Sequence, residues 1–276
     1  MKFTEILAQP ASSPVPETLT CDRICDDHMR EARLIQSSLI PTESLRDPSI
    51  EIAFRFTPFY DVGGDFFDFF RLPNGLIGLY LGDVVGKGLP ATMYGALVMG
   101  TLRGIHKCGT ATDAVLTMLN ERLLQRPLPG RFCSTLYAVF DPPTRTLAFS
   151  NAGLPFPLHA SSTTCQSLGQ GGFPSGMLPA ATYEQHVVQL APGDNILFAT
   201  DGVHESRNSA GDEFGSARMS ELWSQCQDKS APDSLDFLFD GLHKFSDGIT
   251  PHDDIAAIVL KVRASQSPLG LQFLSH

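Results

Sequence analysis

The strand-like segments of this chain follow one another as neighbours, and its helix-like segments also come in adjacent groups. Strand-like segments alternate apolar and polar residues or form short apolar runs, whereas helical segments carry apolar residues at helical spacing. Strands are expected at 50–56, 76–82, 134–141, 145–151, 184–190, 195–200 and 254–262, and helices at 21–39, 89–105, 112–126, 216–227 and 233–245. The regular strand–helix alternation that builds parallel sheets is missing from this order. The sequence therefore predicts an α+β fold with antiparallel sheets.

The chain divides into four regions. Residues 1–20 are rich in Pro, Ser and Thr and are expected to be a flexible lead-in, and residues 21–45 form a regulatory or linker helix. Residues 46–263 form one catalytic-size domain, and residues 264–276 are expected to be a loose tail. The predicted helix has small and apolar side chains at 4-3-4-3-4 spacing, at Cys21, Cys25, His28, Ala32, Ile35 and Leu39. That stripe either docks on the chain's own domain or forms a homodimer through residues 21–40.

Charge and hydropathy exclude several classes of partner. The net charge is −10 and no basic tract is present, so nucleic acid is not an expected partner. No apolar run has membrane-spanning length, and the N-terminus lacks a secretory pattern, so a cytoplasmic protein without membrane contact is expected. The six cysteines are scattered and are expected to stay reduced. The C-x3-C-x2-H run at 21–28 fits a packed helix face better than a zinc site.

Aspartates recur at predicted strand ends next to turns. Four positions share this context, namely Asp65 after a Gly-Gly pair, Asp83 in GDVVGKG, Asp201 in TDG, and Asp253 beside Asp254 in the final DD pair. Carboxylates that converge on one rim repel one another and raise one another's pKa unless a cation compensates their charge. Hard divalent ions such as Mg²⁺ or Mn²⁺ prefer all-oxygen ligand sets. The pattern therefore favours a divalent metal site.

The first of these acids lies in an aromatic segment, FYDVGGDFFDFF at residues 59–70. If a strand leaves the Gly63-Gly64 turn, alternate side chains point to opposite faces of the sheet. The four phenylalanines after the turn can then pack into the core while Asp65 stands at the rim. Asp61, before the glycines, is expected to be an ordinary turn acid.

Other catalytic motifs fit poorly. A phosphate-binding loop requires G-x-x-x-x-G-K-[ST], but GDVVGKG is one residue short, and Gly88 stands where Ser or Thr is needed. No G-x-S-x-G nucleophile elbow and no HExxH zinc motif is present. Neither a nucleotide-binding loop nor a serine hydrolase is therefore predicted.

The ordered motifs resemble a known family, the SpoIIE/RsbU-type branch of the metal-dependent (PPM) serine/threonine protein phosphatases. The resemblance runs from about residue 29 to residue 262 through EARLIQSSLIP, DVGGDFFDFFRL, GDVVGKGLPATM, STLYAVFD, FSNAGLPFPL, FATDGVHESRN, DEFG and DDIAAIVL. Each motif alone is modest, but the ordered set is specific. The resemblance implies a four-layer αββα sandwich of two antiparallel sheets, preceded by the N-terminal helix.

The resemblance also implies a site with two Mn²⁺ or Mg²⁺ ions and room for a third. The implied metal ligands are the side chains of Asp65, Asp83, Asp201 and Asp253 and the backbone carbonyl of Val84. Asp83 is the candidate to bridge both ions. Asp68 and Asp254 are candidate outer-shell or third-metal groups. In this family a metal-activated water attacks phosphorus in line, without a phosphoenzyme.

The substrate that the resemblance implies is a phosphorylated anti-sigma-factor antagonist of a bacterial partner-switching pathway. An upstream sensor or regulator protein is the expected source of the signal. Two alternatives remain open, a non-catalytic phosphoprotein-binding module of the same fold and a small-molecule phosphomonoesterase. Lys87 stands where part of the wider family has histidine, and it either contacts phosphate or is merely exposed. The role of His204 after TDGV is also open.

Overall fold

The computed structural model describes residues 21–106 and 111–263, with the backbone alone for residues 21–25. The predicted lead-in and tail lie outside the described residues. The helices are α1 Cys21–Leu39, α2 Gly88–Ile105, α3 Thr112–Gln125, α4 Asp201–Glu205, α5 Gly215–Trp223 and α6 Ala231–Ser246. The strands are β1 Leu45–Arg46, β2 Ile50–Thr57, β3 Phe66–Arg71, β4 Ile77–Val84, β5 Cys133–Asp141, β6 Thr146–Ala152, β7 Leu158–Ala160, β8 Cys165–Ser167, β9 His186–Gln189, β10 Asn195–Ala199 and β11 Ile255–Val262.

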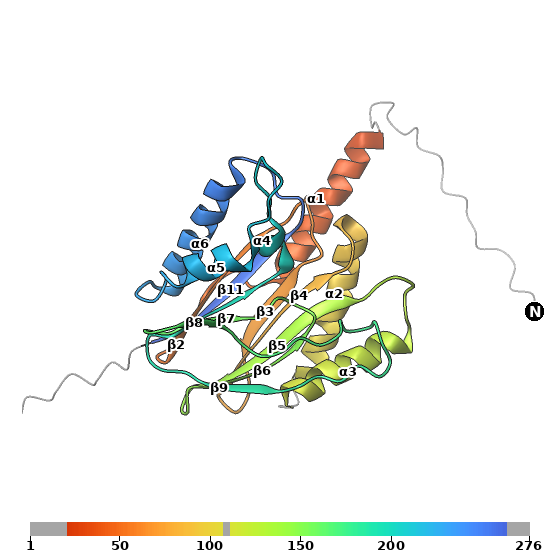
Figure 1. The fold of residues 1–276 in the computed structure, drawn as a ribbon. Coiled ribbons are helices and arrows are strands. Elements are labelled where there is room, and N and C mark those ends of the chain that lie inside the picture. Colours follow the sequence, from red (N-terminus) through yellow and green to blue (C-terminus); the bar gives the residue numbers. More distant parts are fainter. Residues whose placement is uncertain (1–20, 107–110, 264–276) are drawn as a thin grey trace, which may run out of the picture.

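Two antiparallel sheets form the centre of the molecule. One has the strand order β1-β2-β11-β10-β7-β8, and the other has the order β3-β4-β5-β6-β9. Helices α5 and α6 cover the outer face of the first sheet, and α2 and α3 cover the outer face of the second (Figure 1). Helix α1 packs along α2. The predicted α+β sandwich of four layers is confirmed.

Three apolar cores hold these layers together. Side chains of both sheets fill the space between them, among them Phe67, Leu81 and Phe198. A second core lies between the five-stranded sheet and α2 and α3, and a third lies between the six-stranded sheet and α5 and α6. The alternation predicted for the aromatic segment is confirmed, because Phe67 and Phe69 face the inter-sheet core while Phe66 and Phe70 face the helices.

The predicted elements are largely present, but the structure differs from the expectation in several places. The segments expected as strands at 184–190 and 195–200 flank a turn at residues 191–194 (APGD) and do not pair with each other, since β9 joins the five-stranded sheet and β10 joins the six-stranded one. The turn therefore carries the chain from one sheet to the other. The short strands β7 and β8 were not expected, because three-residue segments have too little periodicity to detect. The helix expected at 216–227 ends at Trp223.

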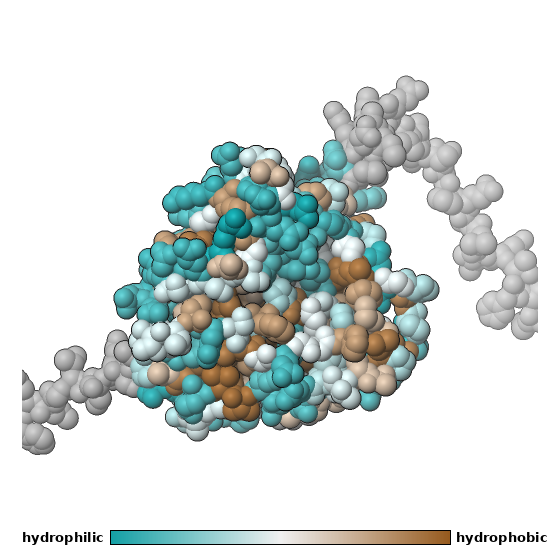
Figure 2. All heavy atoms as spheres, viewed as in Figure 1, coloured by the Kyte–Doolittle hydropathy of each residue, from teal (hydrophilic) through white to brown (hydrophobic). Residues whose placement is uncertain are grey.

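The surface is mostly hydrophilic, with apolar side chains in separate areas (Figure 2). One such area lies on the side of α2 and α3, and α2 contributes the exposed side chains of Leu89, Met93 and Leu97. Within the described ranges, no helix combines the length and apolar character that a membrane crossing requires. The cytoplasmic location stays a prediction.

Two glycines of β4 accommodate aromatic rings of the neighbouring strand. Gly82 lies opposite Phe66 and Gly78 lies opposite Phe70 in the β3–β4 register. A Cβ atom at either glycine would overlap the ring of its partner. The rings therefore cover the glycine backbone, which lets two large side chains pack flat under α2.

Gly82→Ala is expected to lower the free energy of unfolding by about 1–3 kcal/mol, because the added methyl group overpacks the site under Phe66. Gly100→Ala in α2 is the control, since a Cβ there meets no atom within 4 Å. Alanine favours a helix over glycine, so this variant should gain about 0.5–1 kcal/mol. Urea unfolding followed by circular dichroism measures both values. Equal stability of the two variants would contradict the packing described for β3 and β4.

Candidate metal centre

Five aspartates come together at one end of the sandwich. Antiparallel pairing places the start of β3 beside the end of β4, and the end of β10 beside the start of β11. Asp65 immediately precedes β3, Asp83 is the penultimate residue of β4, Asp201 follows β10 as the first residue of α4, and Asp253 and Asp254 precede β11. The acids predicted from the strand ends therefore lie at one end, although Asp201 begins a short helix rather than ending a strand.

Burial and mutual repulsion dominate the electrostatics of this cluster. The Asp65 side chain is almost fully buried, and burial together with the charges of Asp83, Asp254 and Asp201 raises its pKa well above the ordinary value. Burial, followed by the charges of Asp201, Asp253 and Asp254, raises the pKa of Asp83 to about 8. Asp83 lies close enough to Asp65 for its charge to act on that carboxyl group. The cluster thus carries more negative charge than the protein around it compensates.

The Gly63-Gly64 pair allows Asp254 to approach the backbone. Asp254 accepts hydrogen bonds from the backbone N–H of Phe59 at 2.7 Å and of Gly64 at 2.5 Å. A Cβ atom at Gly63 would lie 2.5 Å from this carboxylate, and one at Gly64 would lie 3.1 Å from the carbonyl oxygen of Val84. Only glycine permits both close approaches. Asp254 therefore anchors the loop that carries Asp65.

Side chains of α1 and α2 hold the same loop. Gln36 donates to the carbonyl oxygen of Gly63 at 2.8 Å and accepts from its N–H at 3.2 Å. The Thr92 hydroxyl also donates to this carbonyl oxygen, at 2.8 Å. Gln36 is the one residue of α1 between Asp26 and Leu39 that is buried. The N-terminal helix is thus joined to the loop that positions Asp65.

Thr200 links the two sheets at the aspartate cluster. It was not identified as a site residue from the sequence. Its hydroxyl donates to Asp65 at 2.8 Å and accepts from the backbone N–H of Ala256 at 3.0 Å. Thr200 directly follows β10 of the six-stranded sheet, whereas Asp65 directly precedes β3 of the five-stranded sheet. The signal that could have identified it is its place directly before the Asp-Gly pair. A buried carboxylate at a sheet end needs a donor, and this threonine supplies it.

The turn from β4 into α2 brings the Val84 carbonyl and Lys87 to the same end. Gly86 has a φ of 98°, in the left-handed region, and a Cβ there would overlap the guanidinium of Arg131. Arg131 donates to the carbonyl oxygen of Val85 at 2.6 Å and so fixes the turn. Lys87 forms an ion pair with Asp253 at 2.8 Å. Lys87 is exposed, but its ammonium group is engaged by this ion pair.

Asp68 does not join the cluster. Its carboxylate pairs with Arg103 of α2, with nitrogen–oxygen distances of 2.8 and 3.0 Å, and lies 3.4 Å from the Tyr80 hydroxyl. The outer-shell or third-metal role of Asp68 stays a prediction, and in this structure its carboxylate ties β3 to α2 through Arg103. Asp61 is exposed, as expected for a turn acid.

His204 lies one turn after Asp201 on α4. Burial lowers the pKa of its imidazole, so the neutral form is favoured there. Its Nδ1 atom is buried and has no hydrogen-bond partner among the described residues. The geometry assigns no role to this histidine.

The donors of the cluster suit a hard divalent ion, since all of them are carboxylate or carbonyl oxygens in excess negative charge. Among the side chains that the structure describes, however, no group of three or more His, Cys, Asp and Glu is already arranged to hold a metal ion. The reason is that three of the carboxylates are already bound by other groups of the same chain. Asp253 is engaged by Lys87, Asp254 by backbone amides, and Asp65 by Thr200. The residues fit a metal in chemistry and charge, and their carboxylates would have to reorient to bind it.

Comparison with known proteins identifies the family. The family model of stage II sporulation protein E (SpoIIE) matches residues 73–263, more than half of the chain. Phosphoserine phosphatase RsbU of Bacillus subtilis is 25% identical over 229 residues, which cover 82% of this chain and 68% of that protein.

Solved structures show the same fold. The SiaA-PP2C domain of Pseudomonas aeruginosa superposes with a TM-score of 0.78 at 20% identity, covering 87% of this chain and 98% of that one. RsbX in complex with magnesium superposes with a TM-score of 0.61 at 13% identity, covering 80% of this chain and 98% of that one. The chain therefore belongs to the SpoIIE family, the SpoIIE/RsbU-type branch of the PPM phosphatases, and has their PP2C-type fold.

Proposed function

We propose that this chain is a metal-dependent phosphoserine/phosphothreonine protein phosphatase and that the aspartate cluster is its active site. One observation carries the proposal. Five buried or half-buried aspartates meet at one end of a PP2C-type sandwich, and within the described residues their single ion pair is the one with Lys87. Such an arrangement is costly unless cations bind there. The likeness to RsbU, which is named a phosphoserine phosphatase, supports the reaction class.

The proposed ligands are Asp65, Asp83, Asp201 and Asp253 and the carbonyl oxygen of Val84, with Asp83 in the bridging position. Two bound Mn²⁺ or Mg²⁺ ions supply a water of lowered pKa and neutralise charge on the phosphoryl oxygens. The protein's own contribution is to hold these oxygens in place. Thr200 fixes Asp65, Asp254 holds the loop before it, and Arg131 fixes the turn after Val84. The magnesium bound by RsbX supports a hard divalent ion.

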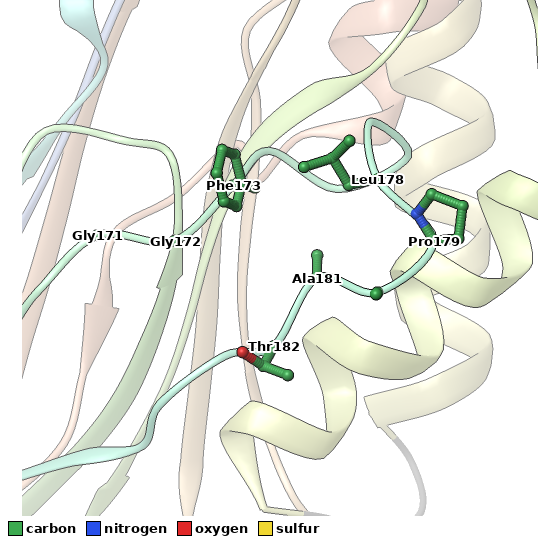
Figure 3. A pocket seen from close by; sticks show the side chains of 8 residues that line it. Gly171, Gly172, Phe173, Leu178, Pro179, Ala181 and Thr182 are labelled. Atoms are coloured by element: carbon green, nitrogen blue, oxygen red, sulfur yellow. The ribbon is translucent and has the colours of Figure 1, made fainter.

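The proposed substrate is a phosphorylated protein, specifically an anti-sigma-factor antagonist in partner switching. An apolar hollow of about 770 Å³ offers contact area for a protein (Figure 3). It is lined by residues 171–173 and 178–182, and this segment is held against α3 by hydrogen bonds of Asn120. Ser175, inside the same segment, pairs with Cys133 at the start of β5, next to the partner of Asp83. A protein substrate would therefore meet this segment as its phosphate reaches the aspartates.

The finer proposal for α1 is a homodimer through residues 21–40 that an upstream regulator controls. Leu34 and Ile35 support it, because their side chains are 67% and 63% exposed. The residues predicted to form one stripe along α1 differ in exposure in the structure. Ile35 and His28 face solvent, whereas Ala32 and Leu39 are partly covered by the domain. The exposed part of the stripe is the surface proposed for the second copy.

Asp83→Asn and Asp201→Asn are each expected to lower Mn²⁺-dependent phosphate release at least about 100-fold, because even outer-shell changes at metal sites cost 10–100-fold. Release from a phosphoserine protein and from p-nitrophenyl phosphate measures the loss. Asp61→Asn is the matched control and should keep full activity, since Asp61 lies in the same segment but outside the cluster. Normal activity of either cluster variant would overturn the metal assignment. A wild-type chain that binds phosphoprotein without releasing phosphate would instead be a non-catalytic module, and exclusive action on free phosphometabolites would indicate a small-molecule phosphatase.

Metal binding is also expected to stabilise the fold. A hundredfold excess of Mn²⁺ over its dissociation constant should raise the thermal midpoint of the wild type by about 5 °C or more. Asp83→Asn should raise the midpoint of the metal-free protein, because one repelling charge is removed, and should abolish most of the Mn²⁺ response. Differential scanning calorimetry with and without chelator gives both numbers. An Asp83→Asn protein that is less stable without metal than the wild type would contradict the repulsion described here.

Ile35→Glu is expected to shift the chain from dimer to monomer, because a charge in the exposed stripe would be buried without a partner. Ser37→Glu adds the same charge to an exposed position of the same helix and should leave the dimer intact. Sedimentation velocity over a range of protein concentrations measures the effect. If the wild type sediments as a monomer throughout, the proposed dimer does not form through this helix.

A further inference from the structure

The turn between β4 and α2 holds Lys87 in a defined position. Gly86 and Gly88, on either side of it, have φ values of 98° and 66°, both in the left-handed region. Lys87 itself is extended, with φ −133° and ψ 164°, and it precedes the first residue of α2. Two glycines are needed because other residues rarely adopt these backbone angles. The backbone therefore directs one lysine side chain toward the start of β11.

The ammonium group of Lys87 has three partners at that point. Its Nζ lies 2.8 Å from a carboxylate oxygen of Asp253, donates to the carbonyl oxygen of His252, and lies 5.1 Å from the centre of the Phe59 ring. The side chain remains 39% exposed, so water and ions can reach it. A freely solvated surface lysine would not combine an ion pair, a backbone hydrogen bond and an aromatic contact.

The partner of Lys87 is one of the acids that the proposed metal site needs. A carboxylate oxygen that accepts a hydrogen bond from an ammonium group has that lone pair occupied, and a divalent cation beside the ammonium would be repelled by it. The ammonium and the metal ion therefore compete for Asp253. In the metal-free protein the lysine offsets one of the five negative charges that lie together.

We propose that Lys87 is a built-in counter-ion that holds Asp253 in the metal-free protein and must leave it when a divalent cation binds, so that this lysine sets the metal affinity of the site. The inference rests on the proposed phosphatase function for the identity of the metal site. Beyond that function, the inference states that Lys87 shifts the equilibrium between the metal-free and the metal-bound protein. No chemical step is assigned to the lysine.

The test compares Lys87→Met with Lys87→Arg in the full chain. Methionine keeps an unbranched side chain over Phe59 and removes the charge, whereas arginine keeps the charge. Lys229→Met is the control for net charge. Lys229 also lies over a phenylalanine, with its Nζ 4.6 Å from the centre of the Phe237 ring. It precedes α6 near the last residues of β11, at the opposite end of the sandwich from the aspartates, since the neighbouring Gln227 accepts a hydrogen bond from Lys261.

Isothermal titration calorimetry of Mn²⁺ into the metal-free proteins is the readout. Lys87→Met should bind Mn²⁺ about fivefold more tightly than the wild type, the effect expected when a competing, partly exposed ion pair is lost. Lys87→Arg and Lys229→Met should stay within about twofold of the wild type. The thermal midpoint of metal-free Lys87→Met should fall, because the acids lose their counter-ion.

Several results would overturn the proposal. Unchanged or weaker Mn²⁺ binding by Lys87→Met would show that the lysine does not compete with the metal. Tighter binding by Lys229→Met to the same extent would show an effect of net charge alone. If Lys87→Met raised KM for a phosphoprotein at unchanged Mn²⁺ affinity, the lysine would act on substrate phosphate instead. A wild type that binds no Mn²⁺ at all would reject the metal site itself, which distinguishes failure of the proposed function from failure of this inference.

Discussion

Repulsion among carboxylates is the constraint on which the rest of this structure depends. Asp83 lies close enough to Asp65 for its charge to act on that carboxyl group, and the remaining three aspartates of the cluster add to the unfavourable field. The protein tolerates this by giving the most buried acids specific donors. Asp254 accepts two backbone amides, and Asp65 accepts the Thr200 hydroxyl. We propose that the charge left uncompensated by these donors attracts a cation to the site.

The pairing of the strands and the glycines of β4 bring these negative charges together. Antiparallel pairing brings strand starts and strand ends to the same end of each sheet, and stacking the two sheets brings the two acids of one to the three acids of the other. The aromatic side chains next to Asp65 fill the core on both faces of β3, and Phe66 packs over Gly82, the residue before Asp83. The packing that stabilises the sandwich is thus the packing that fixes the first two acids relative to each other.

The sequence predicted the parts of this arrangement that depend on local pattern. Alternation and helical spacing placed the principal elements, and strand-end context identified the acids that lie together. Pattern could not show which partner each side chain chooses across long sequence separations. In DFFDFF at residues 65–70, Asp68 looks equivalent to Asp65, but it pairs with Arg103, which lies 35 residues further along. The change of sheet between β9 and β10 was likewise hidden, because a Pro-Gly turn looks the same in a hairpin and in a crossover.

The loop before Asp65 is the point where these constraints meet. Gly63 is bound by Gln36 from α1 and by Thr92 from α2, and Gly64 is bound by Asp254 from the start of β11. Three separate elements therefore determine where the Asp65 carboxylate lies. A displacement of any one of them must either break a buried hydrogen bond or move the loop, and an unsatisfied buried group costs about 1–3 kcal/mol. Helix α1 therefore helps to hold the loop that positions Asp65, although the sequence indicated a separate segment ahead of the domain.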